Sequence, residues 1–296
     1  MKLSTSLKAF RFIILLLITN LSKAQDINSN VELSMRGHIL QSTVNNKTYQ
    51  LYISLPAGYN SADTTRYPVL YVLDANYSYP LISSLHNLLD SGQEIEKIII
   101  VAIGDKDQSN TTWITSRMAD CTPSNDPNVD AEIANGLNIP VSQVKTGGAK
   151  DFLATIRTDI IPFIDRCYKT TNDRGISGHS VGGLFAGYCL LNATDLFKRY
   201  GINSPSFLWN NQEILSSEET FITENSEINA KIFISFGSLE PEIMLPSINS
   251  FISALKEYDC KGLSLTTQIF ENETHISVVA ASTSRTLKVL YGVKRQ

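Results

Sequence analysis

The stretch RGISGHSVGGLFAGYCLL, residues 174–191, decides how this chain folds. Its centre, GHSVG at 178–182, fits the pattern Gly-x-Ser-x-Gly. The residues before it are typical of the end of a strand, and the apolar residues after it are typical of a buried helix. A sharp strand-to-helix turn lifts the central serine above the edge of a sheet, and the flanking glycines keep the two arms from colliding. We therefore predict a nucleophile at Ser180.

A serine hydroxyl needs a neighbouring base that accepts its proton, and histidine is the usual one. The chain has four histidines. His38 lies in an early extended segment, His86 is expected on the surface of a helix, and the side chain of His179 should point away from the serine. His275 lies in a polar loop after the last predicted strand, where a serine in such a turn finds its base. We predict that His275 is the base.

The acid that orients the base should follow a strand between the serine and the histidine. Residues 231–237, KIFISFG, are that strand, and two carboxylates follow it directly. We predict Glu240 as the acid and keep Glu242 as the alternative.

Two backbone amides should stabilise the negative charge that develops on a substrate carbonyl oxygen. The first is the N–H of Val181, which lies at the start of the predicted helix. The second should follow the apolar strand at 69–73, VLYVL. We assign it to Ala75, with Asn76 as a near equivalent.

The rest of the chain predicts an α/β fold. Segments 31–42 and 47–55 are extended on either side of Asn45-Asn46, as in an antiparallel hairpin at a sheet edge. Continuous apolar runs such as KIIIVAI at 97–103 suit strands covered on both faces, hence a parallel sheet. We predict further strands at 199–203, 231–237 and 263–270, and helices around 81–89 and at 149–168, 244–258 and 276–291. This alternation predicts a mostly parallel sheet with helices on both faces.

Residues 104–148 form a long polar insertion with little periodicity. A loop of this length in a compact domain usually has a functional role. We expect it to contribute Trp113 and Arg117 to the site, either as substrate contacts or as packing. Arg117 could bind an anionic group or pair with Asp120. Tyr77 and Asn76, after the strand at 69–73, are further expected substrate contacts.

The N-terminus has the pattern of a secretory signal. Lys2, Lys8 and Arg11 precede an apolar core at 12–21, and small residues follow at Ser22 and Ala24. We expect cleavage after Ala24, with residues 25–296 forming one domain and with no stable membrane anchor left. An uncleaved anchor is the alternative. Removal of residues 1–24 takes away four Lys/Arg and no Asp/Glu, which lowers the formal net charge from −4 to −8. This acidic balance argues against nucleic acid or an anionic membrane as a partner.

Four cysteines follow the signal, at 121, 167, 189 and 260. Their spacing matches no zinc or Cys-x-x-Cys pattern, so we expect no metal at these residues. Export would permit disulfides, but the sequence leaves the pairing open. Cys189 lies in the apolar helix after Ser180 and is expected to be buried.

Several segments together resemble the esterase D and enterochelin-esterase family of α/β-hydrolases. They are YPVLYVLD at 67–74, Arg117 with Asp120 and Thr122-Pro123, GGA at 147–149 with Phe152, GHSVGGLFA at 178–186, SPS at 204–206 and FGSLE at 236–240. The resemblance runs through nearly all of residues 31–291. It implies an α/β-hydrolase fold and hydrolysis of carboxylic esters through an acyl-serine intermediate, without a metal or other cofactor. In one departure, Ala75 stands where the family usually has Gly.

The family's range leaves the small-molecule ester substrate open. Its members include ferric-siderophore trilactone esterases, sugar and feruloyl esterases, thioester hydrolases and mycolyltransferases. Some siderophore esterases are described as working with a Ser–His pair, which bears on Glu240 and not on Ser180 or His275. We predict an exported serine esterase, periplasmic or secreted. The alternatives are an inactive relative that binds a ligand or partner, and an acyltransferase that uses the same residues.

Overall fold

The structure, a computed structural model, describes residues 36–258 and 260–293. The predicted signal at 1–24 lies outside these residues. The described chain contains an eight-stranded sheet with the order β1-β2-β4-β3-β5-β6-β7-β8. The strands are β1 (Arg36–Gln41), β2 (Thr48–Ser54), β3 (Tyr67–Val72), β4 (Ile99–Asp105), β5 (Thr170–His179), β6 (Arg199–Asn203), β7 (Glu227–Leu239) and β8 (Lys261–Thr274).

The sheet is mixed in the way that the sequence predicts. β1 pairs with β2 and β2 with β4 in antiparallel fashion, whereas the pairs from β4 through β3 to β8 are parallel. In β4 the first six residues, 99–104, are all buried, because helices cover both faces of the sheet at this strand. The predicted α/β-hydrolase architecture, with an antiparallel N-terminal hairpin on a mostly parallel sheet, is confirmed.

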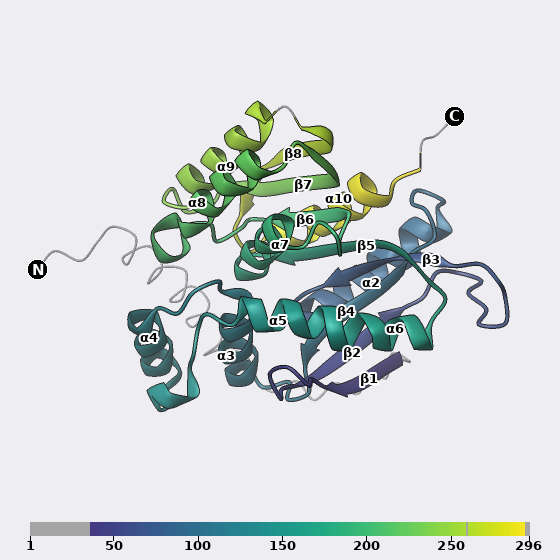
Figure 1. The fold of residues 1–296 in the computed structure, drawn as a ribbon. Helices are drawn as coiled ribbons and strands as arrows, with labels where there is room; N and C mark the ends of the chain where they lie inside the picture. Colours follow the sequence, from purple (N-terminus) through teal and green to yellow (C-terminus); the bar gives the residue numbers. More distant parts are fainter. Residues whose placement is uncertain (1–35, 259, 294–296) are drawn as a thin grey trace, which may run out of the picture.

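Two layers of helices enclose the sheet (Figure 1). Side chains of α2 and α10, such as Ile82 and Leu287, form one apolar cluster with the sheet. Side chains of α3 to α9 form the larger cluster on the other face. The helices are α2 (Ala75–Ser91), α3 (Asn110–Cys121), α4 (Pro127–Leu137), α5 (Ala149–Thr155), α6 (Ile161–Cys167), α7 (Val181–Asn192), α8 (Trp209–Glu224), α9 (Leu245–Glu257) and α10 (Val278–Tyr291).

The predicted helix at 149–168 is continuous but not uniform, since the π-helical segment η2 (Ile156–Ile160) joins α5 to α6. The predicted helices at 244–258 and 276–291 correspond to α9 and α10. The strand predicted at 199–203 is β6, and those predicted at 231–237 and 263–270 are the cores of β7 and β8.

The insertion at 104–148 differs from the prediction, because it is not an aperiodic loop. It folds into α3, α4 and the short 3-10 helix η1 (Val141–Gln143). The side chain of Ser109 caps α3 by accepting a hydrogen bond from the amide of Thr112. Asp126 caps α4, and Pro127 occupies its first position. Strong local capping therefore forms helices where the apolar pattern is weak.

The position of one histidine, His86, differs from the prediction. His86 is not on the surface of α2: it is fully buried and its Nδ1 lies 2.9 Å from Ser54 Oγ. Burial lowers the pKa of His86 to about 4, so the ring is neutral at pH 7. His86 therefore holds α2 against β2 and takes no part in the site.

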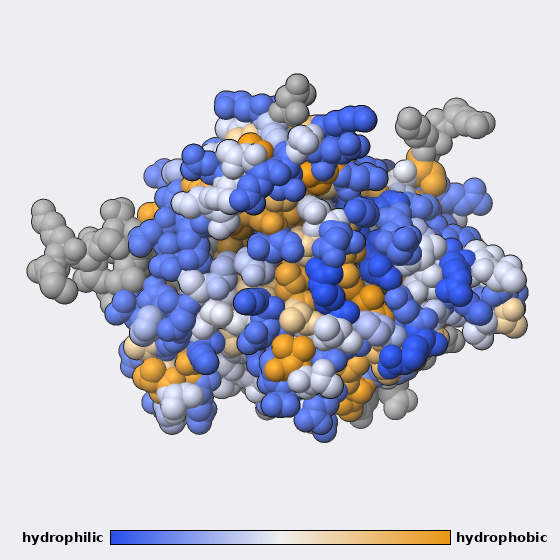
Figure 2. All heavy atoms as spheres, viewed as in Figure 1, coloured by the Kyte–Doolittle hydropathy of each residue, from blue (hydrophilic) through white to orange (hydrophobic). Residues whose placement is uncertain are grey.

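The surface and the cysteines complete the description. On the face shown in Figure 2, hydrophilic side chains predominate and hydrophobic ones appear in separate groups between them. Within the described ranges, no helix is both long and apolar enough to span a bilayer. The four cysteines are unbridged, and Cys189 is buried as the sequence predicts.

Candidate active site

Ser180 lies between β5 and α7 at the edge of the sheet where the parallel strands end. Its backbone has φ 61° and ψ −119°, a conformation that non-glycine residues rarely adopt. A side chain at Gly178 would overlap the backbone of Gly182, which explains the small residue there. The turn presents the hydroxyl above the sheet although the residue itself is only 3% exposed.

The structure brings Ser180, His275 and Glu240 together in one hydrogen-bonded chain. His275 follows β8 and Glu240 follows β7, and the two strands are parallel neighbours. His275 Nε2 lies 3.0 Å from Ser180 Oγ, and His275 Nδ1 lies 2.7 Å from Glu240 Oε2. If Nδ1 donates its proton to the carboxylate, Nε2 is left to accept the hydroxyl proton. Glu242, the alternative acid, is exposed, and the carboxylate bonded to His275 is that of Glu240.

The two expected amide donors begin two helices. Val181 is the first residue of α7 and Ala75 is the first residue of α2. A helix offers no internal acceptor to its first amides, so both N–H groups remain available to an external oxygen. The N-cap of α2, Asp74, has φ 56° and ψ 47°, and this left-handed turn determines the direction of the Ala75 amide.

Three of the expected substrate contacts converge on Asp74. Its Oδ1 accepts hydrogen bonds from Trp113 Nε1 at 3.0 Å and from Arg117 Nε at 2.8 Å. Its Oδ2 accepts from Arg117 Nη2 at 3.0 Å and from Tyr77 at 3.3 Å. The carboxylate and the guanidinium are both almost fully buried. Asp74 therefore fixes all three side chains, and these side chains form part of the wall of the site.

The alternative in which Arg117 pairs with Asp120 is wrong, because Arg117 pairs with Asp74. Asp120 instead accepts hydrogen bonds from Lys47 at 2.7 Å and from Tyr49 at 3.0 Å, on the far side of α3. Arg117 and Asp120 are three residues apart, a spacing that permits contact on a helix, but Asp74 provides both oxygens to the guanidinium. A further Arg117 bond, 3.3 Å to the carbonyl of His179, ties α3 to the turn that carries the serine.

These groups border a cavity of about 590 Å³. Its lining is largely aromatic or amide-bearing. It contains the predicted site residues Asn76, Tyr77, Trp113, Arg117, Ser180 and His275. It also contains His179 and four residues that the sequence did not single out: Gln108, Asn110, Ile276 and Val279. Gln108 and Asn110 belong to the insertion, and Ile276 and Val279 follow His275 in the sequence. A search of the segments around the predicted site residues would therefore have found all four.

His179 lies in this cavity beside the base, whereas we expected its side chain to point away from the serine. Its ring centre is 4.7 Å from that of His275. Burial, and to a lesser degree the neighbouring His275 and Arg117, lower the pKa of His179 well below its usual range. The His179 ring is therefore neutral at pH 7. The hydrogen bond from the serine goes to His275.

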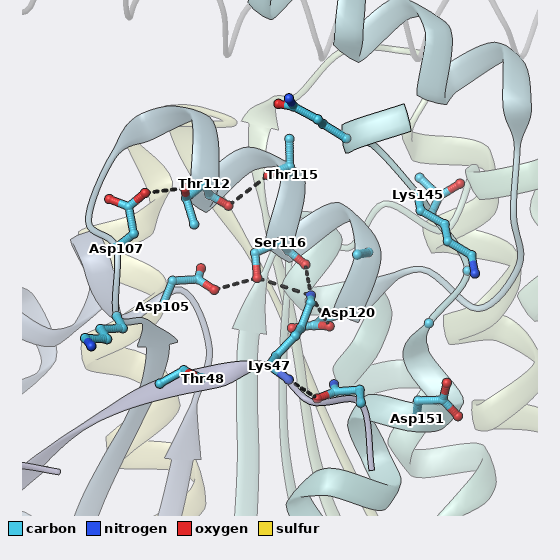
Figure 3. Close-up of a pocket in the computed structure, with 17 residues that line it drawn as sticks. Lys47, Thr48, Asp105, Asp107, Thr112, Thr115, Ser116, Asp120, Lys145 and Asp151 are labelled. Carbon is cyan, nitrogen blue, oxygen red and sulfur yellow. Dashed lines mark hydrogen bonds and ion pairs between the residues drawn. The ribbon is translucent and has the colours of Figure 1, made fainter. Parts of the chain in front are cut away.

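A second cavity of about 830 Å³ lies on the other side of α3 (Figure 3). Asn110, Trp113 and Arg117 line the first cavity, beside Ser180, whereas Thr112, Thr115, Ser116 and Ala119 of the same helix line the second one. α3 is therefore the wall between them. In the parts of the chain that the structure describes, no group of three or more His, Cys, Asp or Glu side chains is arranged to hold a metal ion.

Comparison with known proteins places this geometry in a family. The family model described as "Putative esterase" matches residues 42–243. The ferri-bacillibactin esterase BesA of Bacillus subtilis is 30% identical over 261 residues, which cover 84% of this chain and 87% of that protein. The siderophore enterobactin esterase of Emericella nidulans is 28% identical over 202 residues, 65% of each chain.

A solved structure extends the likeness to three dimensions. The BES protein from Bacillus cereus superposes with a TM-score of 0.73 at 30% identity, covering 92% of this chain and 98% of that one. The family match spans more than half of the chain, and the relatives named above are esterases. The chain therefore belongs to the esterase family and is a carboxylic ester hydrolase.

Proposed function

We propose that the protein is a serine hydrolase that cleaves siderophore-type esters through an acyl-serine intermediate. The observation that carries this proposal is the hydrogen-bonded chain from Ser180 through His275 to Glu240 at the end of the parallel strands. The substrate class is supported by the relatives, which are named for bacillibactin and enterobactin. The cavity volume falls in the range of about 300–1,000 Å³ that is common for small-molecule sites.

Acylation begins when Ser180 Oγ attacks the ester carbonyl carbon. His275 Nε2 accepts the hydroxyl proton as the new C–O bond forms, and Glu240 stabilises the resulting imidazolium. The carbonyl π electrons move to the oxygen, and the amides of Val181 and Ala75 donate to the oxyanion. When the tetrahedral intermediate collapses, the ester C–O bond breaks and His275 gives its proton to the leaving alcohol oxygen.

Deacylation repeats the sequence with water. His275, again neutral, takes a proton from a water molecule whose oxygen attacks the acyl carbon. The second intermediate expels Ser180 Oγ, which recovers its proton from His275. The products are the free acid and the alcohol, and the residues return to their starting protonation. No step requires a metal or an oxidant.

Covalent labelling tests the nucleophile. A fluorophosphonate should add to wild-type protein, with the mass increase on the peptide that contains Ser180, and should not add to Ser180→Ala. The same pair is then assayed with p-nitrophenyl esters and siderophore lactones. A Ser180→Ala protein that keeps more than roughly a tenth of wild-type kcat would overturn the assignment, because removal of a nucleophile usually costs several orders of magnitude.

We also propose that the protein is exported. The pattern at residues 1–24 supports this, with its basic start, apolar core and small residues before the cleavage position. N-terminal sequencing of protein recovered after expression in a bacterial host tests it. A chain that begins at Gln25 in the exported fraction is expected, and a chain that retains Met1 in the cytoplasmic fraction would contradict it.

A further inference from the structure

The second serine of the SPS segment at residues 204–206 takes no part in the proton transfers proposed for the reaction. Its hydroxyl oxygen, Ser206 Oγ, nevertheless lies 3.4 Å from Ser180 Oγ, and both side chains are buried. Resting on the proposed function, we infer that Ser206 is a further catalytic residue. It donates a hydrogen bond to Ser180 Oγ and stabilises the negative charge that develops there. Ser206 keeps its own proton in every step.

The direction of this hydrogen bond follows from the proton on His275. The ring nitrogen Nδ1 lies 2.7 Å from the Glu240 carboxylate, which can only accept, so Nδ1 carries the proton of the neutral ring. The other nitrogen, Nε2, is then an acceptor, and it takes the single hydroxyl proton of Ser180 across 3.0 Å. The proton between the two serine oxygens must therefore come from Ser206.

Backbone hydrogen bonds hold the two serines beside each other. The amide of Ser180 donates to the carbonyl of Asn203 at 3.0 Å, and the amide of Ser206 donates to the carbonyl of Ser180 at 3.0 Å. The carbonyl of Ser206 in turn accepts from the amide of Trp209 at 3.0 Å. Because Ser206 is bonded through both its amide and its carbonyl, the backbone fixes the position of its side chain relative to Ser180.

The turn at 204–206 is also packed closely against its neighbours. Ser204 has φ 41°, in the left-handed region, and its amide donates to the backbone of β7 at 2.6 Å. Such a strained residue persists only where the surrounding structure determines its conformation. A side chain at Gly183, in the first turn of α7, would place its Cβ 3.1 Å from Cα of Pro205. The contacts with α7 and β7 therefore keep the hydroxyl of Ser206 in place.

The hydrogen bond should be weak at rest and strong during the reaction. A distance of 3.4 Å is long for two hydroxyls, whose oxygens usually lie about 2.7–2.8 Å apart. When charge builds on Ser180 Oγ the bond should shorten, because hydrogen bonds to charged oxygens are shorter and roughly twice as strong as neutral ones. Burial of both side chains adds to this effect. An interaction that is stronger in the transition state than in the ground state accelerates the reaction.

Both halves of the reaction place charge on Ser180 Oγ. In acylation, the bond from Oγ to the substrate carbon forms while the hydroxyl proton passes to His275. In deacylation the same bond breaks, and Oγ carries negative charge until His275 returns the proton. Donation from Ser206 assists the attack in the first half and the departure in the second. Loss of this hydroxyl should therefore slow both halves.

Removal of the hydroxyl tests the inference. In Ser206→Ala, kcat/KM for a p-nitrophenyl ester should fall roughly tenfold, the effect expected for one hydrogen bond to a developing charge. Rapid-mixing kinetics should show that the initial release of p-nitrophenol and the later steady rate both decrease by a similar factor. Ser204→Ala is the matched control, because Ser204 Oγ is buried in the same turn and, among the residues that the structure describes, has no hydrogen-bond partner. This control should stay near wild type.

A second substitution separates the hydrogen bond from packing. A thiol is a weaker donor than a hydroxyl although it is larger, whereas the methyl group of alanine is smaller and donates nothing. Activity should therefore decrease from wild type through Ser206→Cys to Ser206→Ala. Thermal unfolding of each variant checks that the fold is retained. A folded Ser206→Cys protein that is less active than Ser206→Ala would mean that the site responds to size, and the inference would be overturned.

Combination with Ser180→Ala locates the effect. Because Ser206 acts on Ser180 Oγ itself, the double variant should have the same residual rate as Ser180→Ala alone. A further loss of about tenfold would show that the Ser206 hydroxyl acts elsewhere and would overturn the inference. A Ser206→Ala protein with wild-type kcat/KM would do the same. Failure of the proposed function would look different, because Ser180→Ala itself would then keep most of the wild-type activity.

Discussion

The backbone of Ser180 is held in a costly conformation by its neighbours. Residues in such sparsely populated regions cost about 1–3 kcal/mol. The amide of Ser180 donates to the carbonyl of Asn203, and its own carbonyl accepts from the amides of Leu184 and Ser206. These bonds join the turn to β6, to α7 and to the segment after β6. The strain at Ser180 is therefore offset by the surrounding elements rather than by the residue itself.

The identity of the acid is a second question at the scale of single residues, because both Glu240 and Glu242 follow β7. Glu240→Gln should lower kcat by about 10²–10⁴-fold, because a neutral amide no longer stabilises the imidazolium or holds the same tautomer. The loss should be smaller than that of Ser180→Ala. Glu242→Gln is the matched control and should stay near wild type. If the two variants exchange these results, the acid is Glu242, and if both are silent the enzyme works as a Ser–His pair.

Ala75 shows how a departure from the family's glycine is accommodated. A side chain at Gly104 in β4 would place its Cβ 2.9 Å from the Cβ of Ala75. Gly104→Ala should therefore displace the start of α2, which carries an amide donor, and lower kcat more than it raises KM. Ala75→Gly should restore much of the activity in the double variant. Steady-state kinetics of both single variants and the double variant measure this coupling, and strictly additive losses would contradict it.

At the scale of elements, the pair of Asp74 and Arg117 joins α3 to the start of α2 and to the turn before α7. Arg117→Met should destabilise the protein by about 3–5 kcal/mol, because it leaves a buried carboxylate unpaired. Adding Asp74→Asn should recover part of that loss. Urea unfolding of the three variants gives the coupling free energy. If the losses of the two single variants simply add up to the loss of the double variant, the pair is not coupled.

Several elements could be predicted from the sequence, and the exceptions have physical causes. β4, β6 and the turn at Ser180 could be predicted because their local sequence patterns are strong. The alternation of strands and helices predicts that the sheet is mostly parallel. α3 was missed because few of its residues are apolar, although Ser109 is a good N-cap. The partner of Arg117 was predicted wrongly because Asp74 is 43 positions away along the chain. Only the fold brings such distant residues together. Sequence spacing alone pointed to Asp120, which lies three residues from Arg117, as a possible partner.

At the scale of the whole molecule, the parallel sheet assembles the site from distant segments. Ser180 and His275 are 95 positions apart, and Glu240 lies 35 positions before His275. Each follows the carboxyl end of a strand, and such ends meet at one edge of a parallel sheet. This is why chain order together with strand ends was enough to predict that these three side chains lie together. The wall of the cavity beside Ser180 comes partly from α3 and the loop before it, which have weaker sequence patterns.

The stability of the whole domain should respond to one buried carboxyl remote from the site. Glu218 on α8 is 2% exposed, and its Oε1 has no hydrogen-bond partner in the described structure. Burial raises its pKa from the ordinary 4.5 to about 9. The folded protein therefore keeps a proton that the unfolded chain releases above pH 4.5. It follows that this group favours unfolding increasingly as the pH rises from 4.5 toward 9.

Glu218→Gln removes this penalty while it keeps the size and one oxygen of the side chain. The Tm of the variant should exceed that of wild type by several degrees at pH 8, since each kcal/mol shifts Tm by about 2–4 °C in a chain of this size. At pH 4 the two should nearly coincide, because the carboxyl is then largely protonated in both states. Thermal unfolding at the two pH values measures the difference. Glu219→Gln removes an exposed carboxylate from the next position of the same helix and should change Tm little at either pH. A Glu218→Gln protein that is less stable than wild type at pH 8 would mean that the carboxylate is ionised and stabilised in the folded state.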